Sequence, residues 1–114
     1  MIEKYSQLVE KLQKATEMRK ITWENTSGAN EYQTIIGENS ISVRYHEKTV
    51  FLVNVEDVTY YSLLLWNKEG KNIDELRAEK GDHDYYPLKK LYESARRACG
   101  RVEETLDDVL SRLD

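Results

Sequence analysis

The sequence contains little cysteine, proline or histidine, with one Cys, one Pro and two His among 114 residues. Because Cys99 is alone, no internal disulfide can form, and we expect a reducing, cytoplasmic environment. No apolar run approaches the roughly 18 residues that a membrane-spanning helix needs, and the first residues begin an amphipathic pattern rather than a signal peptide. We therefore expect neither a membrane span nor export.

The sequence also lacks the motifs that carry catalysis or cofactor binding. Its five glycines are scattered singly, without the spacing that cradles a phosphate. The cluster Asp82-His83-Asp84 could bind a metal or transfer protons, but consecutive residues rarely converge on one ion, and His46 is the only other histidine. Cys99 would need a histidine beside it to act as a nucleophile. We therefore expect no enzyme, no metal site and no cofactor.

Packing residues and charged residues are both abundant. Hydrophobic residues make up 39% of the chain, aromatic residues 10% and charged residues 33%. This composition is too apolar for a disordered chain and too charged for a membrane protein, and the length suffices for one core. We expect a single domain over residues 1–114. The net charge of −4 argues mildly against nonspecific binding to nucleic acid or to acidic membranes.

The spacing of the apolar residues divides the chain into helices and strands. A stripe with a period of 3.6 residues predicts an amphipathic helix over residues 2–20. Alternating apolar and polar residues between turn signals then predict antiparallel strands, with residues 50–55 left open between a strand and a bulged approach. The expected strands are residues 21–26, 32–36, 40–45, 59–67 and 72–77.

The two tryptophans lie within these strand patterns. Trp23 and Trp66 both have apolar neighbours at alternate positions, so we expect both to lie in or against the core of the sheet.

The C-terminal part of the chain carries the longest apolar stripe. Between Pro87 and Leu113, apolar residues return at helical spacing for about seven turns. The stripe keeps its phase across Gly100, which predicts one continuous or mildly bent helix, although glycine costs a helix about 1 kcal/mol. The expected fold is α+β: an N-terminal helix, an antiparallel meander of four or five strands and a long C-terminal helix, with both helices packed on one sheet face.

The charges of this last helix are sorted along its length. Residues 87–101 carry five bases against one acid, a balance of +4, and residues 102–114 carry one base against five acids, a balance of −4. This order opposes the helix macrodipole, which favours acids at the N-terminal end. Antiparallel pairing of two copies would set opposite halves against each other, so a homodimer is one expected form. The alternative is a monomer in which the N-terminal helix neutralises these charges.

Adjacent tyrosines provide a further candidate surface. In each of the pairs Tyr60-Tyr61 and Tyr85-Tyr86, one ring is expected to be exposed, because neighbouring side chains of extended chain point opposite ways. Exposed aromatic and basic groups are typical of protein interfaces and of single-stranded nucleic-acid platforms. The simpler alternative is that the rings complete the core and the charges are merely solvated. The candidate binding residues are Tyr85, Tyr86, Lys89, Lys90, Arg96, Arg97 and Arg101.

The segment Tyr86–Ala98, with its run Ala95-Arg96-Arg97-Ala98, followed by residues 102–110, resembles the C-terminal signature of a loose group of small, uncharacterised bacterial and mobile-element proteins. The opening helix that runs into Ile21–Thr26 is similar to theirs, and Leu64–Gly70 resembles theirs more weakly. Residues 46–58 fall outside this resemblance. It implies a bacterial or phage-type setting and attaches no activity or functional residue.

These observations favour a non-catalytic cytoplasmic domain that binds another protein, as an inhibitor or accessory factor of a bacterial mobile element. The alternative is a nucleic-acid-associated factor that uses the basic half of the last helix, which predicts salt-sensitive binding. An enzyme would require His46, His83 and acidic side chains to converge in a pocket.

Overall fold

The computed structural model describes residues 3–51 and 55–114, with helices at both ends of the chain and five strands between them. The chain begins with α1 (Glu3–Glu17) and ends with α2 (Tyr85–Cys99) and α3 (Val102–Leu113). The strands are β1 (Glu24–Asn25), β2 (Glu31–Ile36), β3 (Asn39–Phe51), β4 (Val55–Trp66) and β5 (Asn72–Glu79).

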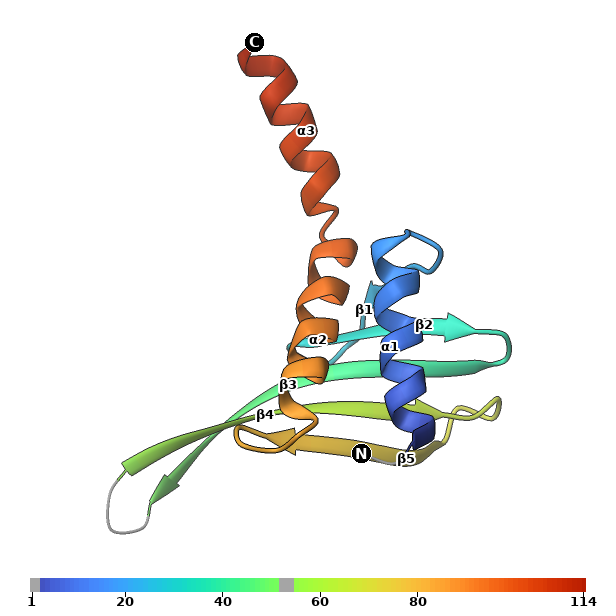
Figure 1. Ribbon diagram of the computed structural model, residues 1–114, viewed down its shortest axis with the longest axis vertical. Coiled ribbons are helices and arrows are strands. Elements are labelled where there is room, and N and C mark those ends of the chain that lie inside the picture. The colour runs from blue at the N-terminus through green and yellow to red at the C-terminus, as the bar shows by residue number, and fades with distance from the viewer. Residues whose placement is uncertain (1–2, 52–54) are drawn as a thin grey trace.

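The strands form one antiparallel sheet in which each strand pairs with its neighbours in the sequence. The pairing of β3 with β4 is the longest, with Ser40 opposite Trp66 at one end and Phe51 opposite Val55 at the other. Helices α1 and α2 lie side by side across one face of the sheet, whereas α3 extends beyond it (Figure 1). The molecule is therefore two layers with a projecting C-terminal helix.

The core fills the space between these two helices and the sheet. Leu63 of β4 and Leu91 of α2 are fully enclosed, and Leu12 of α1 is 4% exposed. Trp23 is also buried in this core, and its indole N–H donates a hydrogen bond of 2.9 Å to the Thr16 hydroxyl. The core position predicted for Trp23 is therefore confirmed.

A group of tyrosine rings forms the part of the core near the middle of the sheet. Tyr45, Tyr61 and Tyr92 contact one another with ring centroids 5.2–6.0 Å apart, and Tyr32 lies 5.5 Å from Tyr92. Such tilted aromatic pairs stabilise a core beyond their buried area. Burial raises the pKa of Tyr61 and of Tyr92 to about 12, so both phenols stay neutral at ordinary pH.

The predicted α+β class and antiparallel meander are confirmed, with changed element ends. The first helix ends at Glu17, because Arg19 takes a left-handed φ of 57° and the Lys20 N–H donates back to the Ala15 carbonyl at 2.8 Å. Of residues 50–55, those at 50–51 end β3 and residue 55 begins β4. Residues 52–54 lie outside the described part of the chain.

The prediction of one continuous or mildly bent C-terminal helix is wrong. Helix α2 ends at Cys99, Gly100 has φ −78° and ψ −3°, and Arg101 is left-handed with φ 52° and ψ 43°. The ladder of helical hydrogen bonds therefore stops, and it starts again only where the Thr105 N–H donates to the Arg101 carbonyl at 2.9 Å. The glycine lowers the cost of this break, since glycine is the residue least favoured in a helix after proline.

The expected burial of the whole C-terminal stripe on the sheet is also wrong, because only its α2 part is buried. Trp66 likewise lies outside the core. It is half-buried on the opposite face of the sheet, where its indole N–H donates to the Ser42 hydroxyl at 2.9 Å. Side chains alternate along β4, so Leu63 and Leu65 face the helices while Trp66 faces away.

Candidate functional site

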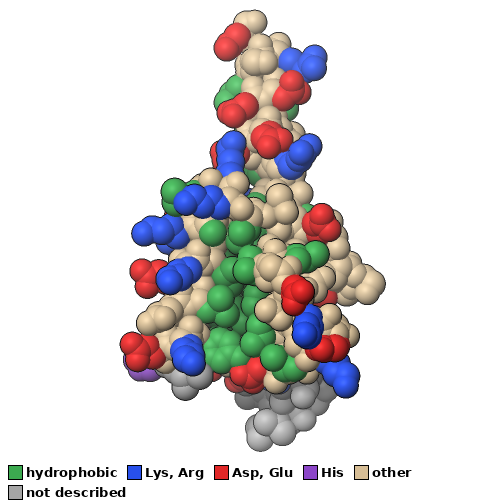
Figure 2. All heavy atoms as spheres, turned by 90° about the vertical axis from the view of Figure 1, so that its right-hand side faces the viewer, with side chains coloured by type: hydrophobic (Ala, Val, Ile, Leu, Met, Phe, Trp, Pro, Cys, Tyr) green, Lys and Arg blue, Asp and Glu red, His purple; other side chains and the backbone are tan. Residues whose placement is uncertain are grey.

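Helix α3 carries an apolar face that no other described part of the chain covers. The apolar residues along this face, called the seam below, are alternately four and three positions apart in the sequence, which is the spacing of a coiled coil. They are Val102, Leu106, Val109 and Leu113, with Leu110 beside them. The exposed fractions are 48% for Leu106, 59% for Leu110 and 77% for Leu113. Figure 2 shows α3 standing clear of the body of the molecule, with acidic groups prevailing on its visible side.

The domain itself gives α3 little support. None of its 12 residues is buried, and α2 is the element that it contacts. Its ion pairs are Arg97 with Glu103, Arg101 with Glu104 at 3.6 Å, and Arg112 with Asp108 at 3.1 Å. All of these side chains are largely exposed, where such pairs contribute about 0–1 kcal/mol. Isolated helices shorter than about 12–15 residues are marginal in water, so α3 is only weakly stabilised by the contacts of its own chain.

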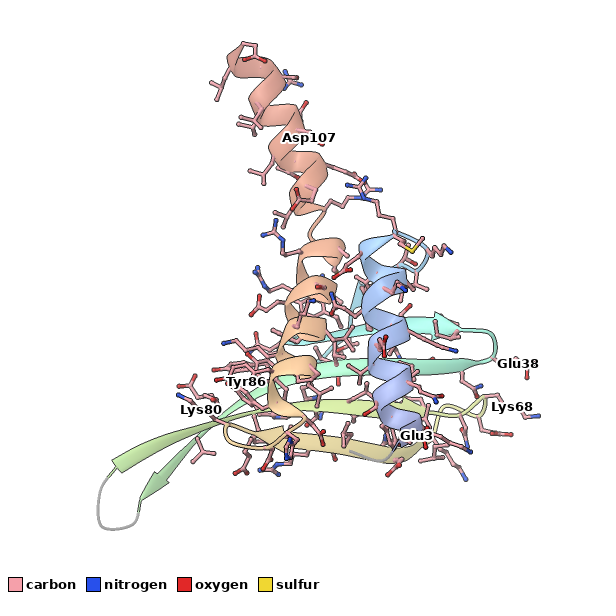
Figure 3. All side chains as sticks on the ribbon, viewed as in Figure 1. Glu3, Glu38, Lys68, Lys80, Tyr86 and Asp107 are labelled. Atoms are coloured by element: carbon pink, nitrogen blue, oxygen red, sulfur yellow. The ribbon has the colours of Figure 1, made fainter. Side chains whose placement is uncertain are left out.

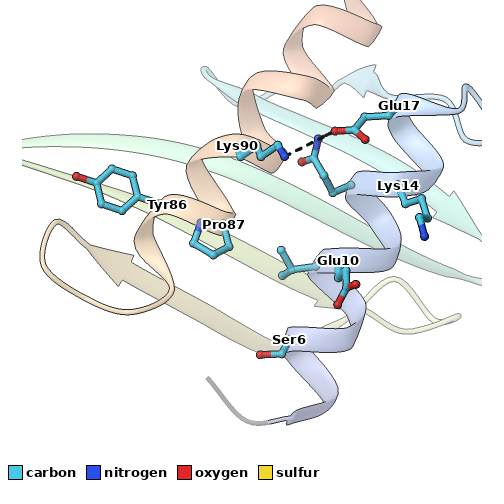
Figure 4. A pocket seen from close by; sticks show the side chains of 9 residues that line it. Ser6, Glu10, Lys14, Glu17, Tyr86, Pro87 and Lys90 are labelled. Atoms are coloured by element: carbon cyan, nitrogen blue, oxygen red, sulfur yellow. Dashed lines mark hydrogen bonds and ion pairs between the residues drawn. The ribbon is translucent and has the colours of Figure 1, made fainter.

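A groove of about 590 Å³ lies between α1 and α2 (Figure 4). The exposed apolar residues that line it are Tyr86 and Pro87, whereas Val9 is only 4% exposed. Lys14 and Lys90 line it as well. Gln13 also lines it: the amide nitrogen donates to Glu17 at 2.9 Å and to Ser94 at 2.7 Å. Its Oε1 atom is buried without a hydrogen-bond partner among the described residues. A buried acceptor of this kind is unusual.

The five bases among the candidate binding residues, here called the ridge, are all exposed, but most of them are paired with acids of the same chain. Lys90 lies 3.9 Å from Glu17, and Arg96 lies 3.1 Å from Glu93. Arg97 and Arg101 pair with α3 as described above. Lys89 has no ion pair in the described structure. The ridge is therefore interrupted by negative charge, which weakens the case for binding along a phosphate backbone.

The structure separates the tyrosine pair Tyr85-Tyr86. Tyr86 is 65% exposed at the first turn of α2, far from Asp107, which lies midway along α3 (Figure 3). Tyr85 is 7% exposed, and its ring packs against Tyr61 with centroids 5.4 Å apart. Tyr85 therefore belongs to the core, and its prediction as a surface binding residue is wrong. The expected exposure of one ring of the pair is correct.

The second face of the sheet carries a polar and aromatic cluster that the sequence analysis did not identify. His46 stacks on Tyr60 with ring centroids 4.4 Å apart, and the Arg77 guanidinium lies 3.6 Å from the centre of the Tyr60 ring. Burial, and then the nearby Arg44 guanidinium, lowers the pKa of His46. Arg44 is held by Glu31, which also accepts from the Thr26 hydroxyl. Alternation along the strands places these side chains on one face of the sheet. Which of them are neighbours depends on the strand register, which the sequence alone does not show.

The residues Asp82-His83-Asp84, considered above for metal binding or proton transfer, lie in the loop between β5 and α2. The Asp82 carboxylate accepts a hydrogen bond of 2.8 Å from the Glu79 backbone N–H, and His83 is exposed. Neither His83 nor His46 lines the groove between α1 and α2. In residues 3–51 and 55–114, no group of three or more His, Cys, Asp or Glu side chains could hold a metal ion.

Comparison with known proteins supplies no relative. No family, no curated protein and no solved structure matches the chain. The resemblance to small bacterial and mobile-element proteins therefore stays a prediction. No helix within the described residues has both the length and the apolar character needed to cross a membrane.

Proposed function

We propose that this protein is a non-catalytic domain that binds another protein through the apolar face of α3. The exposed seam of α3 is the observation that carries the proposal. Four of its large apolar side chains are between 47% and 77% exposed on a helix that buries nothing. Contiguous apolar surface of this kind on a small domain marks a binding surface, since leaving it in water has a cost.

An amphipathic helix that docks by one face is a common mode of protein recognition. In such a mode the apolar seam enters a groove and the flanking charges select the partner. The seam of α3 is flanked by Glu103 and Asp107, so a partner with bases beside an apolar groove suits it. A nucleic acid does not, because its phosphates would meet these acids.

Capture from a bacterial lysate tests this function. We expect the tagged chain to retain a specific protein, either a different protein or another copy of this chain, in moderate salt and after nuclease treatment. The double variant Leu106→Asp and Leu110→Asp should lose that protein, because it puts charge into the seam. The variant Ser111→Asp, on the opposite face of α3, is the matched control and should keep it.

Loss of the retained protein after nuclease treatment would instead favour the nucleic-acid alternative. Equal retention by the seam variant and by the control would contradict a role for the α3 face.

The proposal also places the protein in the bacterial cytoplasm, as an inhibitor or accessory factor of a mobile element. Its only cysteine, Cys99, is a half-buried free thiol, which suits a reducing compartment. Cell fractionation tests the location: we expect the chain in the cytoplasmic fraction, and recovery from the periplasm or the medium would contradict it.

A further inference from the structure

We propose that the partner of α3 is a second copy of this chain, and that α3 of each copy docks in the α1–α2 groove of the other. This inference rests on the proposed function and names the occupant of the same surface. The exchange is reciprocal, so one twofold axis satisfies both seams and both grooves at once.

The shapes of the two surfaces correspond. Helix α3, with 12 residues, is about 18 Å long, and α1, with 15 residues, is about 22 Å long, so α3 can lie along most of the groove beside α1. A third helix packed into the groove between α1 and α2 would cover Tyr86 and Pro87 and bury the seam of α3.

The groove must be that of another copy. Helix α3 continues away from the C-terminal end of α2 and leads beyond the sheet, so it leaves its own groove behind (Figure 1). The break at Gly100 and Arg101 sets the direction in which α3 leaves. Because α3 continues beyond the C-terminal end of α2, reciprocal docking needs a twofold axis that runs across the helices, and each α3 then lies antiparallel to the α2 of its partner.

The positions of the charges favour this orientation. The groove is lined by two bases, Lys14 and Lys90, and two acids, Glu10 and Glu17, whereas α3 carries four acids against one base, a net charge of −3. An antiparallel α3 would bring Glu103 and Asp107 to the end of the groove that holds Lys90 and Glu17. Its base, Arg112, would reach the end that holds Glu10 (Figure 4).

Direct pairing of one α3 with another is the competing arrangement. It would set two helices of net charge −3 against each other, which disfavours it. The intrachain pairs of Arg97 and of Lys90 do not prevent the proposed arrangement, because exposed ion pairs exchange at little cost.

Sedimentation velocity of full-length charge variants tests the inference. One variant replaces the two bases of the groove with acids (Lys14→Glu and Lys90→Glu). The other reverses the charge of two acids beside the seam of α3 (Glu103→Lys and Asp107→Lys). We expect a wild-type dimer, self-association weakened about tenfold or more in either variant, and a restored dimer when the two are mixed. Circular dichroism checks that each variant is folded.

The outcomes separate this inference from the proposed function. A wild-type monomer at every concentration, or a groove variant that associates as tightly as wild type, would overturn the second copy as partner. If such a monomer still captured another protein through the α3 seam, the proposed function would stand without this inference. A monomer whose capture ignored the seam variant would overturn both.

Discussion

At the residue scale, the two tryptophans have different environments although their sequence contexts look alike. Trp23 is 4% exposed and its indole N–H is bonded to Thr16. Trp66 is half-buried on the sheet face turned away from the helices. Burial against the helix layer, and not the strand pattern alone, decides how much each side chain stabilises the fold.

Alanine substitution should therefore distinguish the two. We expect Trp23→Ala to lower the free energy of unfolding by about 3–5 kcal/mol, because it leaves a cavity in the core. Trp66→Ala should cost clearly less, since its ring is partly in water already. Urea titration of both variants measures this. Equal losses would contradict the assigned environments.

His46 gives a second prediction at this scale. Its pKa is lowered in the folded protein, chiefly by burial and then by Arg44, so below about pH 6.5 the unfolded chain binds the proton more readily. The contribution of His46 to stability is thus intact above that pH and is lost as the pH falls towards and through the lowered pKa.

Unfolding titrations between about pH 5 and 7 test this pH dependence. We expect His46→Asn to flatten it, whereas His83→Asn, in an exposed loop, serves as the control and should leave it in place. An unchanged profile in His46→Asn would show that other groups cause it.

At the element scale, α2 and α3 share one apolar stripe but differ in what covers it. Leu91 of α2 is fully enclosed, whereas Leu110 of α3 is 59% exposed. We expect Leu91→Ala to cost about 2–5 kcal/mol and Leu110→Ala less than about 0.5 kcal/mol in protein dilute enough to be monomeric. Chemical unfolding measures both. A comparable cost at Leu110 would mean that α3 packs on its own domain.

The sequence predicted the elements better than it predicted this difference. Helical and alternating periods show which side chains share a face, and they placed α1, the meander and α2 correctly. Periodicity does not show whether a face finds a surface to cover it. The stripe kept its phase through Gly100, but the left-handed backbone of Arg101 redirects the chain there. Conformation at one residue is set by the competition between packing and local strain, which a period cannot reveal.

The candidate site was predicted in part for the same reason. Charge sorting along the last helix and an exposed Tyr86 were visible in the sequence, and the exposed bases follow from the apolar stripe. The groove was not visible, because it is made by α1 and α2 together. Tyr85 looked like a surface ring, yet contact with Tyr61 on β4 brings it into the core.

At the scale of the whole molecule, the two-layer body has a buried core, whereas α3 has no buried residue. The body has a closed core of helices and sheet, while the projecting helix holds apolar groups in water. In the proposed dimer this helix becomes the third helix of the partner's outer layer. Dimerisation would then stabilise the helical conformation of α3, so the helical content of α3 should rise with protein concentration.

Hydrogen exchange of the α3 backbone amides at low and high protein concentration tests this most directly. We expect fast exchange in residues 102–113 of dilute protein, because a helix that buries nothing is marginal, and slow exchange in concentrated protein. The seam variant Leu106→Asp and Leu110→Asp should exchange fast at both concentrations, with α2 protected throughout. Exchange in α3 that is equally slow, or equally fast, at both concentrations in the wild-type chain would contradict docking between copies.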